Sequence, residues 1–165
     1  ALLAAKQKCK KIVVADILDN RLALAKEYGA DAVVNTKRQS LEEFTKEFTN
    51  GNGFDVCIEA CGAPETFLAC IENAAFAANI ILIGNGKRET NFVHSVILKK
   101  ELNIHGSRNA LKDDFISNID IVASRKADVM KMVSGVYDMA DALDAFKALA
   151  SNDGTLAKLL IKIGD

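Results

Sequence analysis

The chain has 165 residues, half of them hydrophobic, so it can bury a core of ordinary size and one domain is the default expectation. Its 21 Lys and Arg against 22 Asp and Glu leave a balanced charge without a basic block, which makes nucleic acid a poor candidate partner. No apolar run approaches the roughly 20 residues that cross a bilayer. Residues 1–11 are too short and too charged for a signal peptide. We therefore expect a cytoplasmic protein without a membrane partner.

The first elements alternate between helix and strand patterns. Residues 1–7 have the composition of a helix but no capping residue in front of it. Residues 12–15 are apolar and β-branched, as in a strand buried on both faces of a parallel sheet. A helix over 18–28 with Gly29 as its stop, and a strand over 31–36, come next. Because a parallel sheet needs an earlier strand to deliver the first helix, we expect the sequence to be a fragment.

The alternation continues at the same spacing. Ser40 and Glu43 form a capping box that starts a helix over 41–49. The following elements are a strand over 54–60, a helix over 65–75 and a strand over 79–84. This spacing indicates βαβ crossovers, and hence an α/β fold with a doubly wound, Rossmann-like parallel sheet that lacks its first strand.

Beyond residue 84 the pattern changes to a polar loop and a short apolar segment at 92–99. The expected later elements are a short helix that includes His94, a strand over 101–105, a helix over 113–124, a strand over 132–137, a helix over 140–150 and a strand over 159–163.

Asp16 is the most informative residue, because it closes the apolar strand at 12–15. A carboxylate at the carboxyl end of such a strand can accept hydrogen bonds from ribose hydroxyls and repels a 2′-phosphate. The alternative is that Asp16 only ends the strand while Asp19 or Asn20 caps the next helix. The sequence alone leaves both interpretations open.

Other chemically active side chains receive structural interpretations. Glu59 lies in an apolar strand, where a hydrogen-bonded structural acid is favoured over a functional one. His94 and His105 lack visible catalytic or metal-binding partners, so we assign neither such a role. The four cysteines form no CxxC pair, and we interpret them as small buried hydrophobes: Cys9, Cys57, Cys61 and Cys70.

Five segments in order and spacing resemble the cofactor-binding half of the zinc-dependent medium-chain alcohol and polyol dehydrogenases. They are residues 13–36, 54–64, 80–86, 99–115 and 138–163. The turn GSRNA at 106–110 resembles the branch that acts on polyols, sugar acids and threonine-like substrates.

The resemblance implies NAD as the cofactor and assigns positions to it. Asp16 and Arg21 match the adenosine-ribose site, and Lys158 matches a basic residue facing the pyrophosphate. Three loops match the rest of the cofactor: Ala60, Cys61 and Gly62 on the adenine side; Ile83, Gly84 and Asn85 beside the nicotinamide; and Ser107, Arg108 and Asn109 at the carboxamide. Arg108 is either a substrate or nicotinamide contact or a plain surface residue.

The departures from the family are large. The glycine-rich turn GxGxxG is absent, and no catalytic or metal-binding residue is assigned. By the resemblance, zinc belongs to an amino-terminal domain outside this chain. Residues 1–106 would be a partial dinucleotide-binding domain, and residues 107–165 a segment that packs on the missing domain.

The resemblance also implies a function and partners. The parent enzyme would transfer hydride between NAD and a secondary alcohol such as a polyol or sugar acid, and the isolated chain would be inactive. The segment 92–105 would pair with its twin in a homodimer or tetramer. The alternative from another class is a non-redox module that binds a nucleotide or adenosyl methionine.

Overall fold

The computed structural model describes residues 2–124 and 129–164 of an α/β chain. The chain divides into two compact units. We call Val34–Ala110 the central unit, and Ala1–Val33 together with Leu111–Asp165 the split unit. The strands of the three-stranded sheet and of the carboxyl-terminal pair run parallel, which confirms the α/β fold expected from the sequence.

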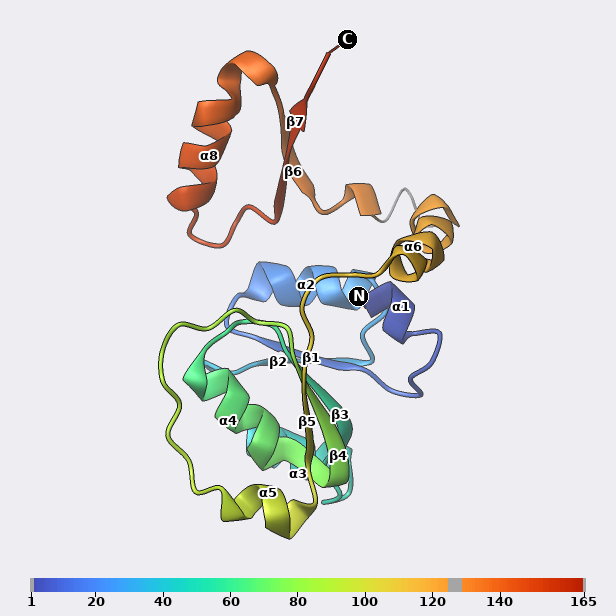
Figure 1. The fold of residues 1–165 in the computed structure, drawn as a ribbon, viewed down its shortest axis with the longest axis vertical. Helices are drawn as coiled ribbons and strands as arrows, with labels where there is room; N and C mark the ends of the chain where they lie inside the picture. The colour runs from blue at the N-terminus through green and yellow to red at the C-terminus, as the bar shows by residue number, and fades with distance from the viewer. Residues whose placement is uncertain (1, 125–128, 165) are drawn as a thin grey trace. The chain divides into compact units, whose positions relative to one another are not determined.

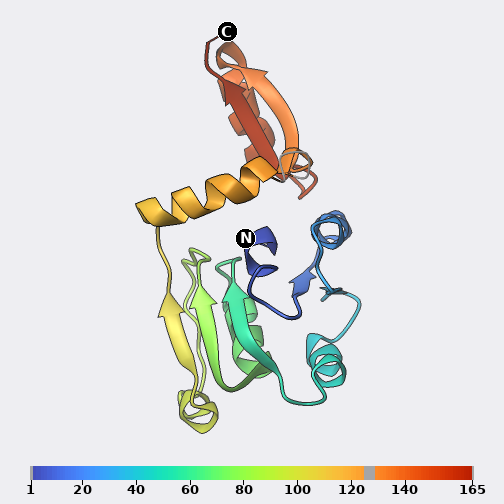
Figure 2. The same cartoon turned by 90° about the vertical axis from the view of Figure 1, so that its right-hand side faces the viewer.

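The central unit is built around a three-stranded sheet. Its strands are β3 (Phe54–Glu59), β4 (Ala74–Leu82) and β5 (Asn103–Gly106), in the order β3-β4-β5. Figure 2 shows these three arrows side by side and pointing the same way. The helices of this unit are α3 (Leu41–Phe48), α4 (Pro64–Asn73) and α5 (Ser95–Lys100). Since the strands are parallel, the loops that follow them meet at one edge of the sheet.

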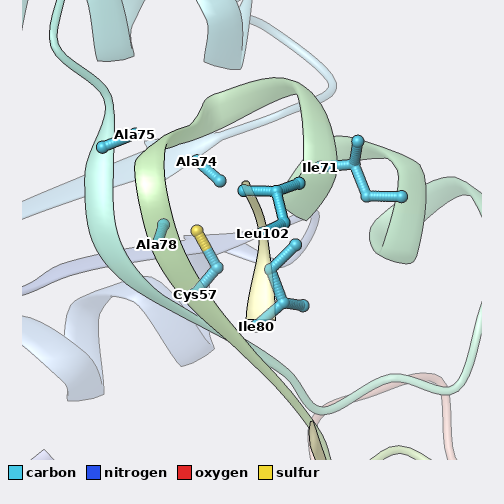
Figure 3. Close-up of a cluster of buried hydrophobic side chains, with 7 residues drawn as sticks. All are labelled: Cys57, Ile71, Ala74, Ala75, Ala78, Ile80 and Leu102. Atoms are coloured by element: carbon cyan, nitrogen blue, oxygen red, sulfur yellow. The ribbon is translucent and has the colours of Figure 1, made fainter. Parts of the chain in front are cut away.

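The hydrophobic core of the central unit surrounds β4. Ile80, near the carboxyl end of that strand, is fully buried and lies in register with Cys57 on one side and Ile104 on the other. Figure 3 shows the cluster of buried side chains, which comprises Cys57, Ile71, Ala74, Ala75, Ala78, Ile80 and Leu102. Burial of these apolar groups is the main stabilising contribution in this unit.

The split unit combines elements from both ends of the chain. From the amino-terminal end come α1 (Leu2–Ala5), β1 (Val13–Asp16) and α2 (Asp19–Glu27). From the carboxyl-terminal end come α6 (Lys112–Ser124), β6 (Val133–Asp138), the 3₁₀ turn η1 (Met139–Asp141), α8 (Ala142–Ala150) and β7 (Lys158–Lys162). β2 (Ala32–Asn35) crosses the boundary between the units and pairs with β1. Figure 1 shows β6 and β7 together with α8, which connects them as a βαβ crossover.

Polar contacts connect distant parts of the split unit. The Asp31 carboxylate accepts hydrogen bonds from the Ile12 backbone N–H at 2.8 Å and from Lys6 Nζ at 3.1 Å. Lys11 Nζ lies 3.5 Å from the other carboxylate oxygen. The hydrogen bond from Ile12, followed by that from Lys6, lowers the pKa of Asp31 to about 2. Asp31 therefore holds the segment before β1 in place through its charge.

Several local predictions are confirmed. The Glu43 backbone N–H donates to Ser40 Oγ at 3.2 Å, so Ser40 caps α3. Gly29 follows α2 with a φ of +95°, which suits glycine at the end of a helix.

Other boundaries differ from the expectation. The helix expected over 65–75 ends at Asn73, and β4 starts at Ala74 instead of 79, because pairing with β3 recruits a stretch of alanines with little intrinsic strand preference. The strand expected from 101 starts at 103, since Glu101 adopts the left-handed conformation that ends α5.

Three further expectations need correction. His94 precedes α5 as its N-cap instead of lying within the helix. Cys57 is buried as expected, but Cys9 and Cys61 are exposed because both lie in loops. The helix expected over 1–7 ends at Ala5, and Ala1 lies outside the described residues. Within residues 2–124 and 129–164, no helix has both the length and the apolar character needed to span a membrane.

Candidate functional site

Asp16 occupies the last position of β1, where the chain turns into α2. Its Oδ1 accepts hydrogen bonds from the backbone N–H groups of Ile17 at 2.7 Å and Leu18 at 2.9 Å. Its Oδ2 lies 3.9 Å from Arg21 Nη1, and the Asp16 side chain is partly exposed. One oxygen thus fixes the turn, while the other lies beside a cation at the carboxyl end of β1. This is the position at which open α/β sheets bind a ribose.

The alternative capping residues do not cap α2. The N-cap is Leu18, which makes no side-chain capping hydrogen bond, and Asp19 is the first helical residue. Asn20 Nδ2 donates instead to the Gly154 carbonyl oxygen at 2.9 Å, in the turn before β7. Asp16 therefore also performs the structural role at this turn, and the two interpretations of Asp16 are compatible.

The loop after β3 is organised by the side chain of Glu59. Only 3% of this residue is exposed, and its Oε1 accepts hydrogen bonds from the backbone N–H groups of Cys61 and Gly62, both at 2.8 Å. Thr66 Oγ1, in the first turn of α4, donates to the same oxygen at 2.6 Å. The structural interpretation of Glu59 is thus supported, and this residue was not among the expected site residues.

The pKa of Glu59 reflects two opposing effects. Burial raises the pKa of this carboxyl, but hydrogen bonds from Thr66 and from the backbone N–H groups of Cys61, Gly62 and Ala63 outweigh it. The net pKa lies below its ordinary value, so the carboxylate is ionised at neutral pH.

The loop after β4 is held by the backbone of the same residue. The Glu59 carbonyl oxygen accepts hydrogen bonds from the N–H groups of Ile83 at 2.9 Å and Gly84 at 3.0 Å. The loop after β5 is connected in turn, because the Ser107 N–H donates to the Leu82 carbonyl oxygen at 2.9 Å. Three expected cofactor loops therefore meet at one end of the central sheet.

Three glycines allow these loops to pack backbone against backbone. A Cβ atom at Gly84 would overlap the Gly62 amide nitrogen and Glu59 Oε2. A Cβ atom at Gly62 would lie 2.6 Å from Gly86 N, and one at Gly86 would lie 2.5 Å from Gly62 O. Gly62 also has a φ of +71°. Side chains are excluded here by sterics, and Gly86 was missing from the expected set although its sequence context, GNG, is that of a tight loop.

The remaining expected residues are exposed. Ala60, Cys61, Ile83 and Asn85 lie on the solvent side of the loops, and Ser107, Arg108 and Asn109 follow β5 in exposed positions. Lys158 begins β7 in the split unit, paired with Val133, and is exposed as well. The structure thus joins nine of the expected residues into one group in the central unit and places Asp16, Arg21 and Lys158 in the split unit.

The described residues do not form a zinc site. Among residues 2–124 and 129–164, no three His, Cys, Asp or Glu side chains gather so that they could hold a metal ion. His105 Nε2 is 3.1 Å from Asn79 Oδ1 at the surface, and His94 is exposed in front of α5. The chemistry of these donors does not fit a catalytic zinc ion, which usually takes three protein ligands.

Parallel strands followed at their carboxyl ends by closely packed glycine loops define a Rossmann-like α/β architecture. The model of one family, described as zinc-binding dehydrogenase, matches residues 1–124. The chain belongs to this zinc-binding dehydrogenase family, as its sequence resemblance implied.

Individual relatives agree with this assignment. D-xylulose reductase of Saccharomyces cerevisiae is 28% identical over 155 residues, which cover 92% of this chain and 44% of the relative. An Escherichia coli oxidoreductase/dehydrogenase of unknown specificity has a TM-score of 0.92 at 27% identity, covering 99% of this chain and 47% of the other. An alcohol dehydrogenase of E. coli in complex with NADH has a TM-score of 0.85 at 26% identity, and the match covers 98% of this chain and 48% of that chain. The chain spans about half the length of each.

Proposed function

We propose that this chain is the cofactor-binding part of an oxidoreductase that transfers hydride between NAD and a secondary alcohol, such as a polyol or a sugar acid. The observation that carries the proposal is the family match over residues 1–124, together with relatives named D-xylulose reductase and sorbitol dehydrogenase. NAD, when bound, supplies the hydride acceptor. No observation favours the non-redox or adenosyl-methionine-binding alternative.

The choice of NAD over NADP is assigned to Asp16. Its Oδ2 lies within the strand-end turn beside Arg21, where it can accept hydrogen bonds from ribose hydroxyls. A 2′-phosphate at the same place would meet the negative charge. The E. coli relative in complex with NADH supports the same cofactor class.

We assign the other parts of the NAD molecule mainly to the loops of the central unit. Following the family resemblance, we assign Ala60–Gly62 to the adenine side and Ile83–Asn85 to the nicotinamide; both loops follow parallel strands of the central sheet. Ser107–Asn109 would hold the carboxamide, and Lys158 would face the pyrophosphate. Exposure of Arg108 and Lys158 is consistent with ligand contacts at either position.

The metal and the missing ligands are assigned to a further domain. The described residues offer no zinc site, and residues 107–165 carry apolar side chains that a second domain would cover. Phe115 on α6 and Phe146 on α8 are 65% and 64% exposed. Residues 1–106 would then form the partial dinucleotide-binding domain. Chain 1–165 alone is expected to oxidise no alcohol.

A homodimer or tetramer is proposed through the segment 92–105. β5 is the outer strand of its sheet, and all four of its residues are exposed, so its outer edge can pair with a second copy. Analytical ultracentrifugation of the full-length protein tests this, and a monomer at micromolar concentration would contradict it. We expect a cytoplasmic location, which cell fractionation checks.

The central experiment measures cofactor and substrate together. Full-length protein containing these residues should quench or shift NADH fluorescence and reduce NAD in the presence of polyols. Asp16→Ser should weaken NADH binding. It should also reduce the preference for NADH over NADPH by about tenfold or more, since the charge that opposes the 2′-phosphate is removed. Asp19→Ser, which removes the same charge three residues later, serves as the control. An unchanged preference in Asp16→Ser would show that Asp16 does not bind the ribose.

A further inference from the structure

Glu59 is the residue through which the loops after β3 and β4 are tied together. Its backbone carbonyl oxygen holds the N–H groups of Ile83 and Gly84, and its side-chain Oε1 holds those of Cys61 and Gly62. Both loops thus depend on one residue at the end of β3.

The contact between the loops leaves little room for adjustment. Gly84 approaches both the Gly62 amide and Glu59 Oε2 so closely that a Cβ atom would not fit. The carboxylate is therefore enclosed by the backbone of both loops, with Thr66 closing the side toward α4. Loss of the Glu59 carboxylate therefore removes the acceptor of the Cys61 and Gly62 amides, at the point where Gly84 packs on Gly62.

The charge on Glu59 matters for the strength of this link. Three donors converge on one carboxylate oxygen, and hydrogen bonds to an ionised acceptor are about twice as strong as neutral ones. An apolar residue could not replace Glu59 in the core, because it would leave the two loop amides without a hydrogen-bond acceptor.

We propose that Glu59 is a positioning residue for the cofactor, whose carboxylate fixes the loop 60–62, against which the loop 83–85 packs at Gly62 and Gly84 to form the surface that the dinucleotide binds. This inference rests on the proposed function. Glu59 itself does not contact the ligand, because it is buried beneath the loops. It acts by keeping their exposed backbone preorganised, so that binding does not have to order them.

The test is made on the full-length protein with NADH as the probe. Glu59→Gln keeps the shape of the side chain but removes its charge, and Glu72→Gln makes the same change at an exposed position of α4. NADH affinity is measured by fluorescence at a temperature well below the unfolding midpoint, which circular dichroism determines for each variant. We expect Glu59→Gln to bind NADH about tenfold more weakly and Glu72→Gln to bind as the wild type does.

A second pair of variants covers the case in which Glu59→Gln fails to fold. Thr66→Val removes one donor to the carboxylate while retaining the side-chain shape, and Thr66→Ser restores the hydroxyl. NADH binding should weaken several-fold in Thr66→Val and return in Thr66→Ser, a rescue that loss of general stability does not explain.

The outcomes separate the two proposals. Wild-type protein that binds no NADH overturns the proposed function and the role of Glu59 with it. Wild-type binding together with unchanged affinity in folded Glu59→Gln overturns the positioning role alone, and weaker binding in Glu59→Gln with a normal Glu72→Gln supports it. Where Glu59→Gln does not fold, the Thr66 pair decides: unchanged affinity in both variants overturns the positioning role, and loss in Thr66→Val with rescue in Thr66→Ser supports it.

Discussion

Different kinds of interaction stabilise the interior of each of the two units. The central unit has a continuous cluster of buried apolar residues around β4, with Ile80 at 0% exposure. In the split unit, α6 has no buried residue, and long-range links include the Asp31 ion pairs and the bond from Asn20 to Gly154. The free energy gained by apolar burial changes little with pH, whereas the free energy of a charged contact changes when one of its groups titrates. The central unit should therefore be the more sensitive to truncation of its apolar core, whereas the Asp31 contacts of the split unit should weaken in acid.

The largest expected effect comes from truncating the core. Ile80→Ala in the central unit should destabilise folding by about 2–5 kcal/mol, because it removes a fully buried side chain and leaves a cavity. The same change at Ile119 on α6, which is 62% exposed, should alter stability by less than about 0.5 kcal/mol. Urea unfolding followed by circular dichroism measures both. Equal losses in the two variants would show that α6 is packed in solution.

A single lysine joins α5 to α4 in the central unit. Lys100 Nζ donates to the carbonyl oxygens of Ile71, Glu72 and Ala74 at 2.8–2.9 Å. Lys100→Met keeps most of the apolar stem but leaves these carbonyls without their donor, and should destabilise by about 1–3 kcal/mol. Lys99→Met, at the exposed neighbouring position, should stay within about 0.5 kcal/mol in the same unfolding experiment. Similar values for both lysines would mean that water replaces the ammonium group without loss.

Backbone strain offers a smaller effect of opposite sign. Ala77 has a φ of +56°, a conformation that costs an L-residue about 1–2 kcal/mol. Ala77→Gly should stabilise the protein by about 0.5–1 kcal/mol, because relief of strain exceeds the added flexibility of the unfolded chain. Ala78→Gly, next to it but without a positive φ, should destabilise by about 1 kcal/mol. A loss of stability in Ala77→Gly would show that the strand relaxes this angle.

The smallest effect concerns acid. The pKa of Asp31 falls from its ordinary value of 3.8 to about 2 on folding, so its contribution is complete above about pH 4 and disappears as the pH falls towards 2. Asp31→Asn should flatten this part of the pH–stability curve, measured by thermal unfolding between pH 2 and pH 5. Asp55→Asn in the central unit is the control and should keep the wild-type slope. If Asp31→Asn keeps it too, the contacts with Lys6 and Ile12 do not contribute to stability.

The sequence predicts best those features that depend on local chemistry. Ser40 caps α3 and Gly29 ends α2 because hydroxyl geometry and glycine φ act within a few residues. Strands rich in β-branched residues, such as the one ending at Asp16, are also found where the apolar pattern predicts them.

The missed features depend on partners far away in the chain. β4 begins in an alanine run because β3 pairs with it, and nothing in that run indicates a strand. Glu59 was classed correctly as structural, yet its connection of two loops appears only when β3 and β4 lie side by side. Gly86 is needed because Gly62 approaches it from another loop. The periodicity of the sequence does not reveal which residues lie close together across the sheet.

The junction between α4 and β4 contains no loop residue, since the C-cap of the helix, Ala74, is also the first residue of the strand. The end of the helix therefore cannot fray without opening the first ladder contact of the strand, and Lys100 ties α5 to the same point. In native-state hydrogen exchange, residues 64–82 should behave as one cooperative opening unit, with amides at the helix end exchanging as slowly as those of the strand.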